Sequence, residues 1–398
     1  RRCGSALGAG QAFAGSRGAG AHGRRGPSGC RRAGAPRLAT DPAAVPDVWT
    51  AGPAEVYSGQ AKRVLCMLKD DPAGFDAGLE EELLALREQR DGEEERRLAM
   101  DRASEKAGKD QLALRKRVEE VQEKERLRTV TELLYLKVCA RFKKLQVPLI
   151  PPLKEGGDVK FGGVDLKGLT TDIYSEDALQ LVREHLFRII GQEGSNSVLG
   201  DIAIVRLALF QVGQVYALSS LFGYYLRRVD SRYQLEKLAG SLGVWDADAA
   251  APAQEDLEAV QSLKDYINTF GPEEVHQMRS IASVEAQMAM ESQVSALFGN
   301  LRVLKERLIS ALDLGAGSDS AEEVERKLEQ AIKNNEVESV RITSDNLRRL
   351  VLEAVAYGAA LNDAEKQVDS LYELTPLAGR PRGSLTGDDE GAGRYLPE

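Results

Sequence analysis

Histidine and cysteine, the residues that most often bind zinc in proteins, are scarce in this sequence. It has three histidines and four cysteines, and none of them forms a C-x-x-C, H-x-x-x-H or H-E-x-x-H pattern. Known zinc sites are mostly built from such closely spaced ligands. We therefore expect no metal site, and the sequence indicates no other cofactor.

Signatures of common enzyme classes are missing as well. The sequence contains no G-x-S-x-G elbow, no lysine-bearing phosphate loop and no cysteine–histidine signature. Residues 18–23 match G-x-G-x-x-G, but no strand is predicted before them and no helix after them. No catalytic residue can be assigned, and a protein without catalytic activity is favoured over an enzyme.

Acidic residues are absent from the first forty positions. Residues 1–40 contain eight arginines and no apolar core of a secretory signal, which is typical of an organelle transit peptide. Without these arginines, 45 of the 53 basic residues remain against 62 acidic ones, a formal charge of −17. A chain so negative is not expected to bind nucleic acid.

Helix-forming residues, by contrast, are abundant. The predicted fold class is mainly α: a multi-helix bundle with an internal duplication (helix, short strand, buried helix) and a minor β component. Helices are predicted at 54–69, 79–90, 112–146, 175–191, 255–270 and 283–299, with two more in an insertion at 300–335. The charged segment 91–111 is predicted to be a solvated connector that is helical or partly ordered, and the Gly-rich segment 154–171 a loop or small hairpin.

The duplication is inferred from two parts of the chain that match in order and spacing. Ser175–Gly191 and Ser283–Gly299 have the same length, and both begin with serine and end with glycine. The other matches are 205–207 with 340–342, Phe222-Gly223 with Tyr357-Gly358, and 229–233 with 368–372 after one extra helical turn.

Residues 207–226 form an uncharged run of twenty residues, long enough to cross a bilayer. Two glutamines and two serines interrupt it, and its counterpart 342–361 carries four charged residues that lipid tolerates poorly. We therefore predict no transmembrane span. The stretch 212–236 is expected to begin as the core helix on which the other elements pack.

These features divide the chain into four parts. We predict a disordered transit peptide at 1–40, a linker with N-terminal helices and the charged connector at 41–111, a helical domain at 112–375 with related halves at about 112–242 and 255–375, and a disordered tail at 376–398.

Polar residues gather at the end of the uncharged helix. The candidate binding patch comprises Tyr224, Tyr225, Arg227, Arg228, Asp230 and Tyr233. Arginine and tyrosine side chains recognise carboxylates and phosphates, so the patch could bind an anion or a partner. In the favoured interpretation, these residues are instead a structural network at the helix end, with Arg227 and Asp230 paired at i, i+3.

Several motifs resemble those of a known family. The first lies between 125–126 and 134–135 and is followed by 147–151. The others lie at 212–217, 223–224, 227–230, 232–236 and 348–355. The resemblance covers about 56–374 and is to a plant and algal plastid family of unknown biochemical role, typified by UV-B-induced chloroplast proteins. It implies a chloroplast-targeted, mainly helical protein linked to light or UV-B stress, and it supplies no catalytic residues. The segments 91–111 and 300–335 depart from the family pattern.

Three functions are compatible with these observations. We expect first a non-catalytic protein of the chloroplast stroma that binds an unknown plastid protein as a scaffold, assembly or regulatory factor. The first alternative is an enzyme, or a binder of an anion or small molecule, that uses Arg227–Tyr233. The second is a peripheral thylakoid protein, held by the helix before Pro148, whose Arg141, Lys143 and Lys144 would meet anionic lipid.

Overall fold

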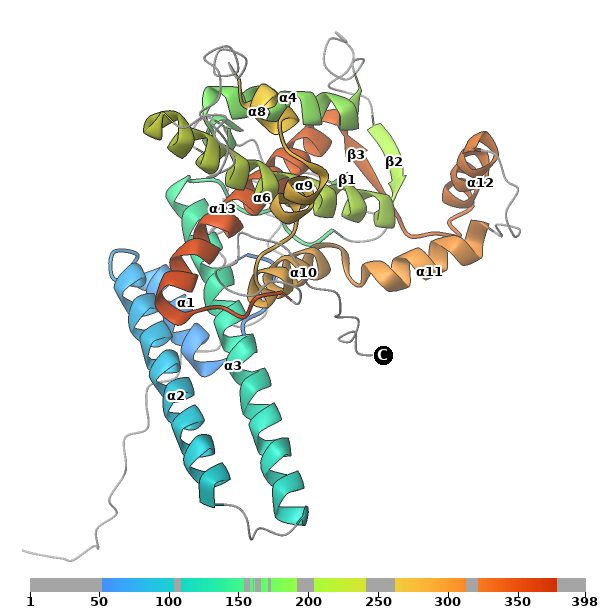
Figure 1. Cartoon of the computed structure of the whole chain (residues 1–398). Helices are drawn as coiled ribbons and strands as arrows, with labels where there is room; N and C mark the ends of the chain where they lie inside the picture. The colour runs from blue at the N-terminus through green and yellow to red at the C-terminus, as the bar shows by residue number, and fades with distance from the viewer. Residues whose placement is uncertain are drawn as a thin grey trace, which may run out of the picture. The chain divides into compact units, whose positions relative to one another are not determined.

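The computed structural model of this chain (Figure 1) describes a mainly helical protein with one small sheet, as the sequence predicted. The described residues are 52–103, 109–153, 158–159, 161, 166–170, 173–191, 204–240, 262–312 and 321–377. All of them belong to one compact unit, Val45–Glu398. The predicted transit peptide and the tail from 378 onward lie outside the described residues.

Helices α1 (Gly59–Asp70), α2 (Phe75–Ala103) and α3 (Lys109–Lys144) come first in the chain. The first helix begins later than predicted because Ser58 caps it, its Oγ accepting a hydrogen bond from the Ala61 N–H. The charged connector is not a separate element: its described residues extend α2 and begin α3, whose ends project away from the other helices (Figure 1).

In the second half of α3, one side of the helix is apolar and packs in the core. Leu134, Val138 and Phe142, which are spaced at i, i+4 and i+8, are buried there. The helix stops before Pro148, because proline cannot continue the hydrogen-bond pattern of a helix. This half of α3 packs against α1 and against the later helices α10 and α13.

Helices α6 (Leu209–Ala239) and α13 (Ser344–Tyr372) form the centre of the core. Each carries a glycine where the two helices meet. A Cβ on Gly223 would lie 2.0 Å from the Val355 carbonyl oxygen, and a Cβ on Gly358 would lie 1.8 Å from the Ser220 carbonyl oxygen. Because glycine has no Cβ, the two backbones can touch.

The two core helices are not equally enclosed. Every residue of 349–362 on α13 is buried, whereas Gln214 and Leu218 on the uncharged helix α6 are exposed. The expected role of α6 as the helix on which all others pack is therefore shared with α13, which carries more charge. Charged residues of α13 tolerate burial because other parts of the chain supply hydrogen bonds to them.

A three-stranded sheet of order β1-β3-β2 lies next to the starts of the two core helices. β2 (Ile204–Ala208) and β3 (Ser339–Thr343) pair antiparallel, with a register that is symmetric about Arg206 facing Arg341. β1 (Asp158–Val159), in the Gly-rich segment, pairs parallel to β3. Such a two-fold register is what two copies of one strand–helix unit would form.

Helices α4 (Glu176–Ile190) and α10 (Val284–Phe298) are the predicted matching pair. Both have 15 residues, both have a serine N-cap, and both end at a glycine with φ near 80°. α4 packs against α13 and α10 packs against α6. Each helix of the pair thus contacts the core helix of the other proposed half, while the division of the domain into halves stays a prediction.

The remaining elements connect this core. They are the 3-10 turn η1 (Leu166–Leu169) and the helices α8 (Leu263–Asn268), α9 (Pro272–Arg279), α11 (Leu301–Leu312) and α12 (Ala321–Lys333). α11 and α12 confirm the two helices predicted in the insertion. The helix predicted at 255–270 is described only from residue 262 onward.

Candidate functional site

Arg227 joins α6 to α13 and to the segment before α4. Its Nε donates to the two carboxylate oxygens of Asp363 at 2.9 and 3.1 Å, and its Nη1 donates to the Ile173 carbonyl oxygen at 3.0 Å. The expected i, i+3 pair with Asp230 is not formed. Asp363 takes that place because α13 passes directly beside this face of α6.

Asp230 is buried and holds the start of α4. It accepts hydrogen bonds from the Ser175 Oγ at 2.7 Å and from the Gln234 Nε2 at 3.3 Å. Ser175 is also the N-cap of α4, so its oxygen serves the Ala178 N–H while its proton goes to the carboxylate. The role of Asp230 here is to fix a helix terminus.

Tyr224 is fully buried between α6, α13 and the segment before α10. Its Oη donates to Glu365 and accepts from the Ala282 N–H at 3.1 Å. Burial is the main reason why the pKa of Tyr224 is raised. Burial also raises the pKa of Glu365, against the hydrogen bonds from Ser283 and Tyr224 that lower it.

The other three patch residues point to different neighbours. Arg228 Nη1 donates to the carbonyl oxygens of Gln277 and Ser280, at 3.0 and 3.2 Å. The ring of Tyr233 packs 5.2 Å from that of Tyr266, and Tyr225 lies half-buried on the core. The observed contacts of the patch thus resemble the structural network more than a converging pocket, and anion binding there stays a prediction.

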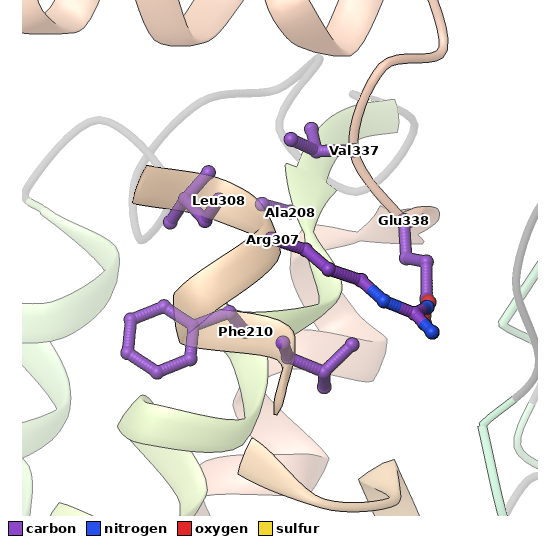
Figure 2. A pocket seen from close by; sticks show the side chains of 7 residues that line it. Ala208, Phe210, Arg307, Leu308, Val337 and Glu338 are labelled. Carbon is purple, nitrogen blue, oxygen red and sulfur yellow. The ribbon is translucent and has the colours of Figure 1, made fainter. Parts of the chain in front are cut away.

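The patch also lies apart from the small cavity shown in Figure 2. That cavity is lined by Ala208, Phe210, Leu304, Arg307, Leu308, Val337 and Glu338. Its volume of about 10 Å³ has room for roughly one water molecule. None of the six patch residues contributes to its wall.

Sequence reasoning missed the buried glutamate on α13. Glu353 is fully buried, and each of its carboxylate oxygens accepts from the Ile150 N–H at 3.0 Å. Burial raises the pKa of Glu353 to about 8, although the hydrogen bond from the Ile150 N–H and the charge of Arg349 oppose this. A signal existed, because one acid stands within the otherwise apolar run after Arg349, but such a residue is also common at a solvated helix edge.

A chain of buried polar side chains connects three helices. Tyr135 Oη on α3 donates to Gln293 Oε1 on α10 at 3.0 Å, and Gln293 Nε2 donates to Tyr216 Oη on α6 at 3.1 Å. Tyr135 also accepts from the Ala54 N–H at 3.2 Å. The chain satisfies polar atoms that would be costly to bury alone, and it orders α3 on the core.

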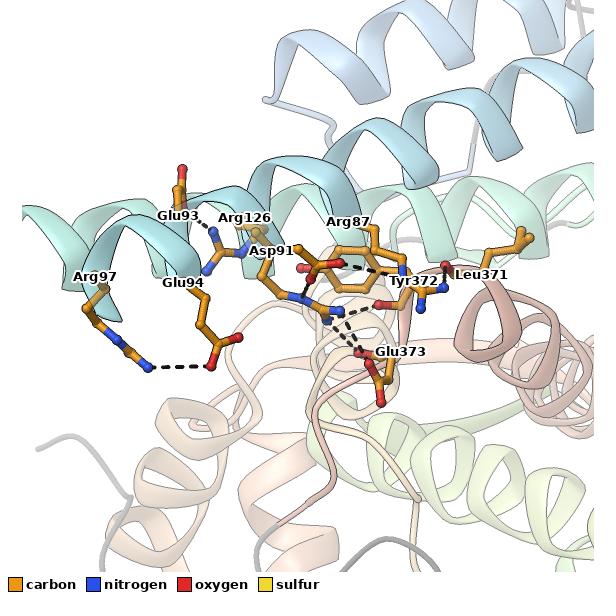
Figure 3. A network of polar contacts seen from close by, with 10 residues as sticks. Arg87, Asp91, Glu93, Glu94, Arg97, Arg126, Leu371, Tyr372 and Glu373 are labelled. Atoms are coloured by element: carbon orange, nitrogen blue, oxygen red, sulfur yellow. Dashed lines mark hydrogen bonds and ion pairs between the residues drawn. The ribbon is translucent and has the colours of Figure 1, made fainter. Parts of the chain in front are cut away.

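Arginines of α2 bind the end of α13 (Figure 3). Arg87 donates to the Leu371 carbonyl oxygen at 3.2 Å, and Arg90 donates to those of Tyr372 and Glu373 at 3.0 and 3.1 Å. Cations at a helix C-terminus are stabilised by the helix dipole and the free carbonyl groups. These hydrogen bonds attach the middle of α2 to the C-terminal end of α13.

The helix before Pro148 is engaged with protein on its apolar side. Lys143 donates to the Leu68 carbonyl oxygen, and Lys144 pairs with Asp76 at 2.9 Å.

Across the described residues no three His, Cys, Asp or Glu side chains are grouped to hold a metal ion. In the same part of the chain, no helix is both long and apolar enough to cross a membrane.

Comparison with known proteins gives the context for these observations. A sequence model described as a protein of unknown function (DUF760) matches residues 113–239 and 262–369. The chain is also 28% identical over 357 residues to a UV-B-induced chloroplastic protein of Arabidopsis thaliana, covering 81% of this chain and 77% of that relative. No solved structure matches. Because the matched segments make up more than half of the chain, the protein belongs to the DUF760 family.

Proposed function

We propose that this protein acts in the chloroplast, in the response to UV-B or other light stress, by binding another plastid protein without catalysing a reaction. Its place is the stroma, and its role is that of a scaffold, assembly or regulatory factor. The relative in Arabidopsis, which is named as chloroplastic and UV-B-induced, supports the compartment and the setting. The arginine-rich, acid-free leader supports the same compartment.

One observation carries the binding role: an apolar stripe on the projecting part of α3. Leu114, Val118 and Val121 follow each other at i, i+4 and i+7, and they are 67%, 48% and 44% exposed. Residues at this spacing share one side of a helix. Aligned apolar side chains on a solvated helix are typical of a surface that packs against a partner helix.

The stromal location is preferred to a thylakoid surface for a structural reason. The apolar side of the helix before Pro148 is buried in the core, and both Lys143 and Lys144 already bind protein groups. A helix bound to a membrane interface needs these same groups free for lipid. In fractionated chloroplasts we expect the protein in the stroma at low salt; release only by a high-salt wash of thylakoids would favour the peripheral alternative.

The test of partner binding is a pull-down from UV-B-treated chloroplasts with the tagged full chain. We expect a plastid protein in stoichiometric amount, and we expect Val118→Glu to remove it because a charge enters the apolar stripe. The matched control is Glu119→Gln, the next and also exposed residue of α3, which should retain the partner. A pure, unaccompanied bait, or a partner that ignores Val118→Glu, would count against the proposal.

A further inference from the structure

Helices α4 and α6 correspond in position to α10 and α13. The Ser175 Oγ at the start of α4 donates to Asp230 of α6, and the Ser283 Oγ at the start of α10 donates to Glu365 of α13. These contacts set the correspondence: 108 positions separate the two serines, and 135 positions separate the two acids. Every other residue of the two helix pairs can be matched by the same shifts.

Matched residues differ in how well they are covered. We define the α4–α6 face as His185, Leu186, Ile189, Leu218 and Phe222. All five are partly or fully exposed, and Leu218 is 56% exposed. Their counterparts on α10 and α13 are Gln293, Val294, Leu297, Glu353 and Tyr357. These five are buried.

The five buried counterparts on α10 and α13 are covered by α3 and the chain that follows it. Tyr135 of α3 bonds Gln293, and the Ile150 N–H bonds Glu353. On the other pair, α8 is the described helix that contacts both α4 and α6. Lys264 of α8 pairs with Glu184 of α4 at 3.1 Å. However, α8 has only six residues, and Leu218 remains exposed beyond it.

The α4–α6 face is a partly exposed apolar surface that is already ordered, because Leu186, Ile189 and Phe222 also pack against the core. The rings of His185 and Phe222 stack with centroids 4.2 Å apart and planes inclined by 9°. His185 Nε2 also lies 3.1 Å from the Ser219 Oγ. Burial lowers the pKa of His185 to about 4, so the ring is neutral near pH 7. A helix that binds here would meet few side chains that need reordering.

The edges of this surface carry positive charge. Arg183 and Arg188 of α4 are exposed beside it, and Arg279 of α9 is exposed near Tyr225. On α10, glutamate and alanine occupy the positions that match Arg183 and Arg188. The acid on the α4 side, Glu184, is paired with Lys264. An incoming helix would therefore gain from acidic side chains along its flanks.

We propose that the α4–α6 face is a docking site for an amphipathic helix of a partner protein, with an acidic polar side. The occupant is a helix because the matching face of this chain is covered by one. It is acidic because arginines border the face. The proposal rests on the proposed function, to which it adds a second contact surface besides the α3 stripe.

The first experiment uses a defined helix as probe. It is a labelled peptide of residues 129–144 in which all four basic residues are replaced by Glu, and the unmodified peptide serves for comparison. With the full chain at low salt, fluorescence anisotropy should show saturable binding of the acidic peptide that weakens as salt is added. Leu218→Glu should raise its Kd at least tenfold, whereas Leu114→Glu on α3 should leave it unchanged.

Charge reversal tests the acidic character. Arg188→Glu should weaken binding of the acidic peptide several-fold and strengthen that of the unmodified peptide. Because Leu218 and Arg188 are exposed, both variants should keep the wild-type melting temperature, measured by circular dichroism. Absence of saturable binding, or the same Kd with Leu218→Glu, would overturn the proposal.

Two further measurements distinguish a partner helix on this face from a second copy of the chain and from binding at the α3 stripe alone. If light scattering shows a wild-type dimer that Leu218→Glu converts to a monomer, the occupant is a second copy of the chain and the proposed partner helix is wrong. If the partner recovered from chloroplasts is lost with Val118→Glu but retained with Leu218→Glu, the proposed function stands and this docking site fails.

Discussion

Gly223 of α6 and Gly358 of α13 lie at matching positions of the helix crossing, and each accommodates the backbone of the other helix. The nearest atom to a Cβ on Gly223 would be the Val355 carbonyl oxygen, and for Gly358 it would be that of Ser220. Val355 and Ser220 are separated by the same 135 positions as the two glycines. The crossing therefore has a local two-fold relation, like the β2–β3 register.

Substituting either glycine should destabilise the protein. In Gly223→Ala the new methyl group would lie 2.0 Å from a backbone oxygen, so the helices must separate. We expect a loss of about 2–4 kcal/mol in the free energy of unfolding, measured with urea, because overpacked cores relax only by moving the backbone. The control is Gly92→Ala in α2, where the nearest atom is 4.0 Å away and a gain of up to about 1 kcal/mol is expected.

Glu353 should make stability depend on pH. Its folded pKa of about 8 lies above the ordinary value of 4.5 because the carboxyl is buried. The folded state therefore binds a proton that the unfolded state has lost, and this contribution is full below pH 4.5 and is lost as pH rises to about 8. Urea unfolding at pH 6 and pH 8.5 should show a smaller decline for Glu353→Gln than for wild type. Parallel pH profiles would contradict this.

The two N-cap serines should contribute unequally. Ser283→Ala removes the cap of α10 and a hydrogen bond to Glu365, while Ser175→Ala removes the cap of α4 and a hydrogen bond to Asp230; both acids are buried. Cap removal costs about 0.5–2 kcal/mol. We expect the larger loss for Ser283→Ala because its surroundings are more fully buried. Equal losses by chemical denaturation would show that burial of the capping serine is not important.

Arg228 allows the two interpretations of the polar patch to be compared. Because it binds two carbonyl groups before α10, Arg228→Ala should lower the free energy of unfolding by about 1 kcal/mol. Phosphate should raise the melting temperature of the wild type and of this variant equally, through its general salt effect. A phosphate shift present only in the wild type would support the anion-binding alternative.

One sequence match does not correspond to the structural relation. The segment 229–233 resembles 368–372, which would make Asp369 the counterpart of Asp230. The contacts instead relate Asp230 to Glu365, since each binds the N-cap serine of a matching helix. Asp369 accepts from the Leu374 N–H at the end of α13. Sequence identity could not reveal this, because a serine hydroxyl can donate a hydrogen bond to either an aspartate or a glutamate.

Local patterns in the sequence determined the helices, several caps and the matching pair α4 and α10. These features depend on residues that are close in the chain. Tertiary structure decided which core helix is most enclosed and where the polar patch makes its bonds. Partners such as Ile150 for Glu353 and Asp363 for Arg227 are more than one hundred residues away, so only packing brings them together. The same packing covers α10 and α13 with α3 and leaves the α4–α6 face partly exposed.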